Sequence, residues 1–528
     1  MKRVFARGAA LFAAIAVTSC ARSPQPPVRD AVYRHLTGDP ATLDPVTTTE
    51  ENGILVEEMI FRPLVGLDSN ARPAPALARS WTVSPDGTTY EFRLDPDAEW
   101  EDGSPVTSDD VLFTIERIRD PKVPAFNYRD LFEEVTGIET PDASTVRVRF
   151  STPYAERLLA FDVPIVSRAA YGKTKSAPDL DRRPEGSGPY RLEKWETNQA
   201  ISLVRREGTP GTAAAFRRVV FRVIPDPTVR FRAGLRGDLD EFRIARDQRP
   251  SAESSADFAA RNRLLKVPNP NEAYVLWNLR DPFLADSRVR RALAHAWPRE
   301  ETARRLYPPE GARLVSGPYL PGAPENDPRM RPPSYDPSLA ARLLDEAGWR
   351  GRPDGFRARG GKRASSELLY PSGQPIYDAL AEILRTSYQK VGVELVLRPL
   401  DWAAYSERSD ASEFDAQLTA RVFLPPNPDP YPHFHSSQVP PRGQNYGFYR
   451  NPEADRAMEA ARREADPARR LLLYREVHRL LGADPPADFL WGADQYWGVS
   501  RKVDGVATSP LGLFHFLPGP LGWRPVKD

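Results

Sequence analysis

The sequence predicts a mixed α/β protein of several lobes. Three features lead to this expectation: the length of the chain, an early region rich in strands, and a later region in which helices are followed by strands. A chain of 528 residues is too long for a single hydrophobic core, so two or three domains are expected. With 40% hydrophobic and 27% charged residues, the composition is that of a globular protein.

The N-terminus has the layout of an export signal. A positively charged start precedes a short apolar run over residues 9–17, and small residues then lead to Cys20. The run is shorter than the about 20 residues that cross a bilayer. Prolines follow at once and would end a core helix. We therefore expect residues 1–19 to be a signal peptide.

Cys20 is the single cysteine of the chain, so the mature protein cannot form an internal disulfide. Residues 17–20, Val-Thr-Ser-Cys, resemble a bacterial lipobox, with valine where leucine is usual. The resemblance implies that Cys20 becomes the lipidated first residue, which would attach the protein to a membrane through a linker over residues 20–28.

The charge balance excludes some partners. Lys and Arg together number 73 against 72 for Asp and Glu. A chain so close to neutral is not expected to bind nucleic acid or an anionic membrane surface through its charge.

The early region contains strand signals. Residues 81–94 predict a β-hairpin, because Pro85-Asp86-Gly87 supplies turn residues. Tyr90, Phe92 and Leu94 then alternate with polar residues, which is typical of a half-buried strand. Residues 146–150 repeat this alternation.

Later segments alternate between helix and strand. Asp336-Pro337 and Asp466-Pro467 each combine an N-cap with proline at the first helical position. A third helical pattern runs from Ile376 to Val391, and a strand over residues 393–397 follows it directly. Gly348 is a candidate for the C-terminal cap of the first helix.

The search for an active site finds little chemistry. No zinc-protease motif and no nucleophile elbow occurs in the sequence. Gly186-Ser187-Gly188 has the wrong spacing for the elbow, and we expect a flexible turn there. His433 and His435 have metal-like spacing, but no carboxylate or cysteine cluster lies beside them in sequence. We therefore expect no metal, no cofactor and no catalytic site.

Residues 80–118, "SWTVSPDGTTYEFRLDPDAEWEDGSPVTSDDVLFTIERI", resemble the signature of extracellular solute-binding proteins of family 5, the peptide- and nickel-binding proteins of ABC importers. Further matching segments occur in the expected order along nearly the whole mature chain. They are Thr42-Leu43-Asp44-Pro45, Gly186-Ser187-Gly188-Pro189-Tyr190, "VRRALAHAWPRE" at 289–300, "YDPSLAARLLDEAGW" and "NYGFYRNPEADRAMEAA".

The resemblance implies a two-lobed periplasmic-binding-protein clamp (type II, cluster C-like), with an extra mixed α/β domain inserted in the first lobe. Such lobes close around a ligand at hinges. The ranges implied are 29–65, 187–270 and 494–528 for lobe one, 66–186 for the extra domain, and 271–493 for lobe two.

The resemblance also implies ligand contacts in lobe two. Trp402 and Phe423 would line the pocket with flat side chains, Arg421 would pair with a ligand carboxylate, and Asp429 would lie at the pocket edge. Either aromatic residue could instead fill the core, and Arg421 could be a surface arginine. Weaker candidates on the strand that enters the lobe are Tyr274, Trp277 and Asn278.

One departure from the family pattern concerns specificity. Peptide-binding members carry an aspartate three residues before the acidic-Pro step, where it pairs with the free amino end of the peptide. Here Pro426 stands at that position, and proline has neither a charge nor a backbone donor. Asp429 is the residue that could substitute for the missing carboxylate.

The sequence thus predicts a lipoprotein in the periplasm or at the cell surface, a monomer that captures a peptide or similar small solute. It would deliver the solute to ABC permease and ATPase subunits. An exported hydrolase is one alternative, and a sensor or scaffold that uses the same clamp without transport is another.

Overall fold

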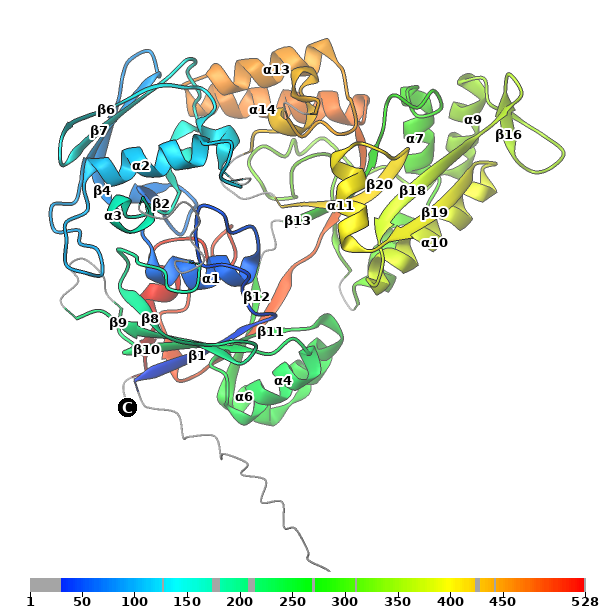
Figure 1. Cartoon of the computed structure of the whole chain (residues 1–528). Coiled ribbons are helices and arrows are strands. Elements are labelled where there is room, and N and C mark those ends of the chain that lie inside the picture. The colour runs from blue at the N-terminus through cyan, green and yellow to red at the C-terminus, as the bar shows by residue number, and fades with distance from the viewer. Residues whose placement is uncertain are drawn as a thin grey trace, which may run out of the picture.

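The computed structural model describes residues 30–125, 128–172, 181–207, 214–267, 271–308, 311–422, 428–440 and 443–526. Within these ranges the chain forms two bodies joined by strands that run between them (Figure 1). Helices and sheets occur in both bodies, so the prediction of a mixed α/β protein is confirmed.

The first lobe is built on two sheets. One has the order β1-β10-β9-β8 and the other the order β11-β22-β12. Their strands are β1 (Ala31–Leu36), β8 (Tyr190–Glu196), β9 (Ala200–Arg205), β10 (Arg218–Val223), β11 (Glu241–Ile244), β12 (Asn262–Val267) and β22 (Gln495–Ser500). The helices of this lobe are α1 (Glu51–Ile60), α4 (Pro227–Arg236), α5 (Arg249–Ser254) and α6 (Ala256–Arg261).

The inserted domain carries a sheet of order β4-β5-β7-β6. The predicted hairpin is confirmed: β4 and β5 pair antiparallel, and Gly87 in their turn has a φ of 70°, a value that favours glycine. The elements are β2 (Val65–Leu67), β3 (Pro73–Pro75), β4 (Ala78–Val83), β5 (Thr89–Leu94), β6 (Val135–Asp142), β7 (Thr145–Phe150), α2 (Ser108–Arg119) and α3 (Arg168–Tyr171).

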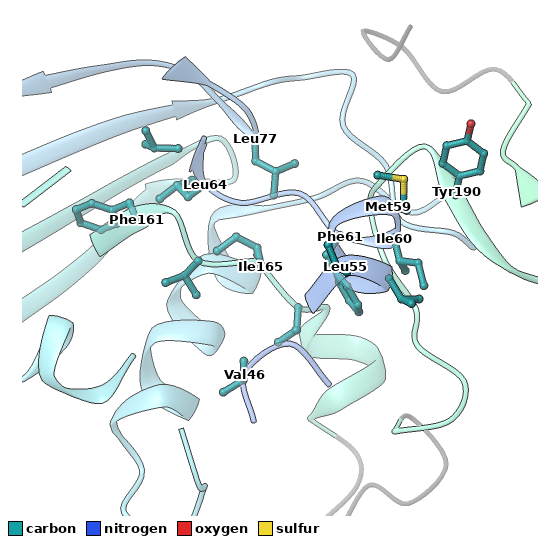
Figure 2. Packing of buried hydrophobic residues seen from close by; sticks show 14 of the residues in the cluster. Val46, Leu55, Met59, Ile60, Phe61, Leu64, Leu77, Phe161, Ile165 and Tyr190 are labelled. Carbon is teal, nitrogen blue, oxygen red and sulfur yellow. The ribbon is translucent and has the colours of Figure 1, made fainter. Parts of the chain in front are cut away.

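The first lobe and the inserted domain share one hydrophobic core. Figure 2 shows Leu55, Met59 and Ile60 of α1 in this core together with Phe161 and Ile165 of the inserted domain. Burial of apolar surface contributes about 25 cal/mol per Å² to folding. Because the core is shared, this contribution stabilises both parts together.

The segment that returns from the inserted domain passes very close to α1. The amide of Gly188 donates to the carbonyl of Ile60 at 2.7 Å. A Cβ atom on Gly186 or Gly188 would lie 2.0 or 2.6 Å from that carbonyl oxygen. The expectation of a flexible turn is therefore wrong, because the glycines here permit tight packing of two backbones.

The second lobe contains a sheet of order β14-β21-β13-β20-β18-β19 with a hydrophobic cluster on each face. Its strands are β13 (Asn271–Trp277), β14 (Arg313–Leu314), β18 (Ser365–Pro371), β19 (Glu394–Leu400), β20 (Ala416–Val422) and β21 (Ala487–Gly492). A separate small sheet consists of β15 (Arg350–Gly351), β16 (Arg357–Arg359) and β17 (Lys362–Arg363).

Helices cover both faces of the six-stranded sheet, as the two clusters show. One face packs against α7 (Ser287–His295), α8 (Arg299–Leu306), α9 (Pro337–Glu346) and α10 (Pro375–Lys390). The other packs against α11 (Trp402–Asp410), α12 (Tyr431–Phe434), α13 (Pro452–Arg463) and α14 (Pro467–Ala483). The two predicted Asp-Pro helix starts are confirmed, since Asp336 and Asp466 accept from backbone amides of α9 and α14.

Candidate functional site

One edge of the second-lobe sheet faces the connections to the first lobe. Strand β13 begins at this edge after the chain leaves β12, and β21 ends there before the chain enters β22. The parallel strands β18 and β19 also end there, at Pro371 and Leu400, which pair with each other. Ligands of open α/β sheets bind outside the carboxyl ends of strands. The sheet topology thus identifies this edge as the candidate site.

Strand register places Tyr274 at this edge. Tyr274 pairs with Thr419 of β20, and the register between β18 and β20 makes Thr419 level with Pro371. The Tyr274 side chain is half-buried, with its ring 6.2 Å from that of Phe489.

Trp402 lies just beyond the same edge. Asp401 follows β19 and caps α11 by accepting from the amide of Ala404 at 3.1 Å, which makes Trp402 the first residue of the helix. Its side chain is 67% exposed and lies beside Tyr405, with ring centroids 5.6 Å apart. A tryptophan so exposed does not fill the core, so the alternative considered for it is excluded.

Trp277 and Asn278 lie at the other end of β13. Trp277 is buried in the core and pairs with Ala416 at the start of β20. The Asn278 amide donates to the carbonyls of Ser412 and Phe414 at 3.2 and 2.8 Å. Because of this strand register, the structure does not bring these two residues to the edge that faces the first lobe.

Several predicted residues lie outside the described part of the chain. These are Cys20, Phe423 and Pro426; for Arg421 the structure describes the backbone at the end of β20 but not the side chain. Their roles stay predictions.

Asp429 is buried and lies beside a positively charged side chain. Its side chain is 1% exposed, and its Oδ2 lies 3.2 Å from Nε of Arg462 in α13. Its Oδ1 accepts from the amide of Tyr431 at 3.0 Å. Burial acts to lower the pKa of the Arg462 guanidinium, but nearby groups, Asp429 foremost, raise this pKa overall.

A cluster of titratable groups in the first body was not found from the sequence. His515 pairs with Glu58 of α1, and both side chains are partly exposed. Burial first, and then the charge of Glu58, raises the pKa of nearby Asp162 to about 7. These residues come from distant parts of the chain, so no local motif could have indicated them.

Asp130 of the inserted domain lies near the second lobe. Burial raises the pKa of Tyr446, and the charges of Asp410 and then Asp130 raise it further. Since Tyr446 and Asp410 belong to the second lobe, this effect places groups of the two bodies close together.

The second chain crossing carries a small ionic cluster. Asp494 lies between β21 and β22, and its carboxylate is 2.8 Å from Arg313 of the second lobe and 3.3 Å from Lys266 of the first. Arg246 of the first lobe lies over the ring of Tyr307 at 4.2 Å. These contacts link the two lobes at this crossing.

Two hollows of about 570 and 400 Å³ lie within the second lobe. The larger is lined by Asn278 and Arg408 among others, and the smaller by His295 and Phe489. The larger hollow lies near the start of β20, and the smaller one includes the start of β21. Both strands run toward the candidate site, so both hollows lie toward the opposite end of the strands.

The described residues contain no group of three or more His, Cys, Asp or Glu side chains placed to hold a metal ion. His435 stacks on Tyr431 at 4.0 Å, and its Nε2 lies 3.3 Å from Glu459. Among the described helices, none combines the length and apolar character needed to span a bilayer.

Two lobes joined by two chain crossings, with strand ends that face those crossings, form the architecture of a solute-binding clamp. The sequence profile of the "Bacterial extracellular solute-binding proteins, family 5 Middle" matches residues 72–440. The chain belongs to this family of bacterial extracellular solute-binding proteins, as the sequence predicted.

Relatives of similar length support the assignment. Protein XP55 of Streptomyces lividans is 28% identical over 491 residues, which cover 91% of this chain and 86% of that protein. The oligopeptide-binding protein AppA of Bacillus subtilis is 24% identical, with coverage of 90% and 88%.

Solved structures share the fold. NikZ from Campylobacter jejuni, determined with Ni(L-His), superposes with a TM-score of 0.79 at 24% identity, covering 94% of this chain and all of that one. The predicted two-lobed clamp is therefore confirmed.

Proposed function

We propose that this protein captures a peptide or similar small solute between its two lobes and delivers it to the permease and ATPase subunits of an ABC importer. The observation that carries the proposal is the sheet edge of the second lobe. Tyr274 and exposed Trp402 lie there, at the same end of the sheet as the two crossings to the first lobe. An exposed tryptophan at such an edge offers a large flat contact surface for a ligand.

The names of the relatives favour a peptide over other solutes. AppA of Bacillus subtilis is described as an oligopeptide-binding protein and a relative from Escherichia coli as a dipeptide-binding protein, whereas NikZ was solved with a nickel–histidine complex. A peptide and a nickel–histidine complex both carry a carboxylate group, which Arg421 would bind through its guanidinium fork.

The division into lobes follows the sheets. We assign residues 29–65, 187–270 and 494–528 to lobe one, 66–186 to the extra domain and 271–493 to lobe two, since every sheet except β2-β3, whose strand β2 begins at Val65, falls within one of these assignments. The first lobe would move against the second about the crossings near Val267 and Asp494.

We further propose that the protein works as a non-catalytic monomer held at a membrane by lipidated Cys20, in the periplasm or at the cell surface. The positively charged start, the short apolar run and the lipobox-like residues before Cys20 support the anchor.

Mass spectrometry of the protein purified under native conditions tests the proposed function. We expect the native mass to exceed the denatured mass by that of a small molecule, which fragmentation would identify as a peptide or chelate. Denatured and refolded protein is the control. A protein that never carries a solute, even from a peptide-rich medium, would contradict the proposal.

A further inference from the structure

Arg462 is enclosed by groups from both bodies. Its guanidinium carbon lies 4.6 Å from the ring centre of Tyr154 in the inserted domain and 4.1 Å from that of Tyr431 in the second lobe. The third wall is the carboxylate of Asp429, 3.2 Å from Nε.

Two aromatic faces and a buried carboxylate form a site suited to a cation. Ammonium and guanidinium groups are attracted to aromatic faces within about 6 Å of the ring centre. A carboxylate as buried as that of Asp429 needs a positive partner, because an isolated buried charge is unfavourable. The protein's own guanidinium occupies this position.

Backbone hydrogen bonds hold the walls of the site. The amide of Ala155 donates to the carbonyl of Arg462 at 2.9 Å, and the amide of Tyr431 donates to Oδ1 of Asp429 at 3.0 Å. Arg462 also lies in the last turn of α13, where the helix dipole favours a positive charge. The site is therefore built for a cation on this helix.

We propose that Arg462 determines specificity, because its guanidinium occupies the cation site formed by Tyr154, Tyr431 and Asp429 and so keeps Asp429 from anchoring the amino group of a ligand. This inference rests on the proposed function for its ligand. Pro426, at the position where peptide-binding relatives carry an aspartate, has no charge that could replace Asp429. The protein therefore has no carboxylate at these two positions for the amino end of a ligand, and the ligand does not need a free amino end.

Chemical rescue tests the cation site without any solute. In Arg462→Ala we expect the melting temperature to fall, and millimolar ethylguanidinium to restore at least half of the loss. Ethylurea, its neutral analogue, should restore none. Arg463→Ala is the matched control, since the neighbouring Arg463 is 65% exposed, and it should respond to neither compound. Equal effects of the two compounds, or no rescue, would overturn the cation site.

A second variant covers the case in which Arg462→Ala does not fold. Asp429→Asn/Arg462→Ala removes both charges, so it should fold better than Arg462→Ala and should not respond to ethylguanidinium. A double variant that is no more stable than the single variant would contradict a favourable interaction between Asp429 and Arg462.

Calorimetry with trialanine and N-acetyl-trialanine tests the consequence for specificity. The wild type should bind the two with affinities within tenfold of each other, and Arg462→Ala should prefer trialanine by tenfold or more. A tenfold preference for trialanine in the wild type would refute the proposal. If neither peptide binds, the proposed peptide specificity fails, while ethylguanidinium rescue still decides whether the cation site exists.

Discussion

Nε of Arg470 in α14 lies 2.9 Å from Oε1 of Glu156 in the inserted domain, and both side chains are less than one-fifth exposed. This ion pair joins the second lobe to the inserted domain at a place separate in sequence from the two chain crossings. Burial raises the pKa of Glu156, and the charge of Arg470 acts against that rise. The arginine thus offsets the unfavourable burial of a carboxylate.

Removal of Arg470 should therefore destabilise the protein more than removal of both partners. Arg470→Ala leaves Glu156 without its cation, whereas Glu156→Gln/Arg470→Ala leaves no charge. We expect a coupling free energy of about 0.5–3 kcal/mol, the range for directly interacting pairs, from urea unfolding of the two single variants and the double variant. Strictly additive effects would show that the pair does not couple the two parts.

Glu57 should make stability depend on pH. Burial raises the pKa of this carboxyl from 4.5 to about 8, so the folded state binds its proton more tightly than the unfolded state. Its stabilising contribution is complete below about pH 4.5 and is lost as the pH rises toward 8. At about 1.4 kcal/mol per pKa unit, the loss is on the order of a few kcal/mol.

The matching variant is Glu57→Gln, which keeps the shape of the side chain and can still accept from Thr48. Melting temperatures between pH 5 and pH 8 should fall less steeply for this variant than for the wild type. Glu51→Gln, at an exposed position of the same helix, is the control and should keep the wild-type slope. Parallel curves for wild type and Glu57→Gln would rule out this role.

Trp402 should contribute to solute binding and little to folding. Because its side chain is 67% exposed, Trp402→Ala should change the free energy of unfolding by less than about 0.5 kcal/mol, as surface substitutions do. The affinity for the co-purified solute should fall tenfold or more, which is equivalent to about 1.4 kcal/mol of binding free energy. Leu472→Ala, at a 64% exposed position of α14, is the control for loss of exposed apolar surface. Solute retention equal to that of the wild type would remove Trp402 from the site.

Cys20 should carry lipid. Bacteria that express the full chain should incorporate labelled fatty acid into the protein, and Cys20→Ser should abolish the incorporation, because the thiol is the attachment point. Membrane fractionation should show the Cys20→Ser protein released. A Cys20→Ser protein that is still acylated would refute the anchor.

Local patterns in the sequence predicted the elements well. Asp336-Pro337 begins α9, Gly348 follows its end with a φ of 85°, and Pro85-Asp86-Gly87 lies in the turn between β4 and β5. Each of these signals acts within a few residues, through capping or through turn geometry. Such signals do not depend on contacts with the rest of the chain.

The candidate site was predictable only in part. The family pattern singled out Trp402, which the structure leaves exposed at the sheet edge, and its part in binding stays a prediction. The partner of Asp429 could not be inferred, since Arg462 reaches it through the packing of α13, and Tyr154 comes from a different domain. Trp277 was misplaced for a similar reason: only the pairing of β13 with β20 shows which end of the strand faces the first lobe.

Small-angle scattering on one preparation, before and after its solute is removed, tests the central claim of capture between two lobes most directly. A ligand that contacts both lobes favours the closed arrangement. We therefore predict a smaller radius of gyration for the loaded protein, an increase on stripping, and a return when the identified solute is added back. The same radius in all three states, with binding verified by mass, would contradict closure of the lobes around a solute.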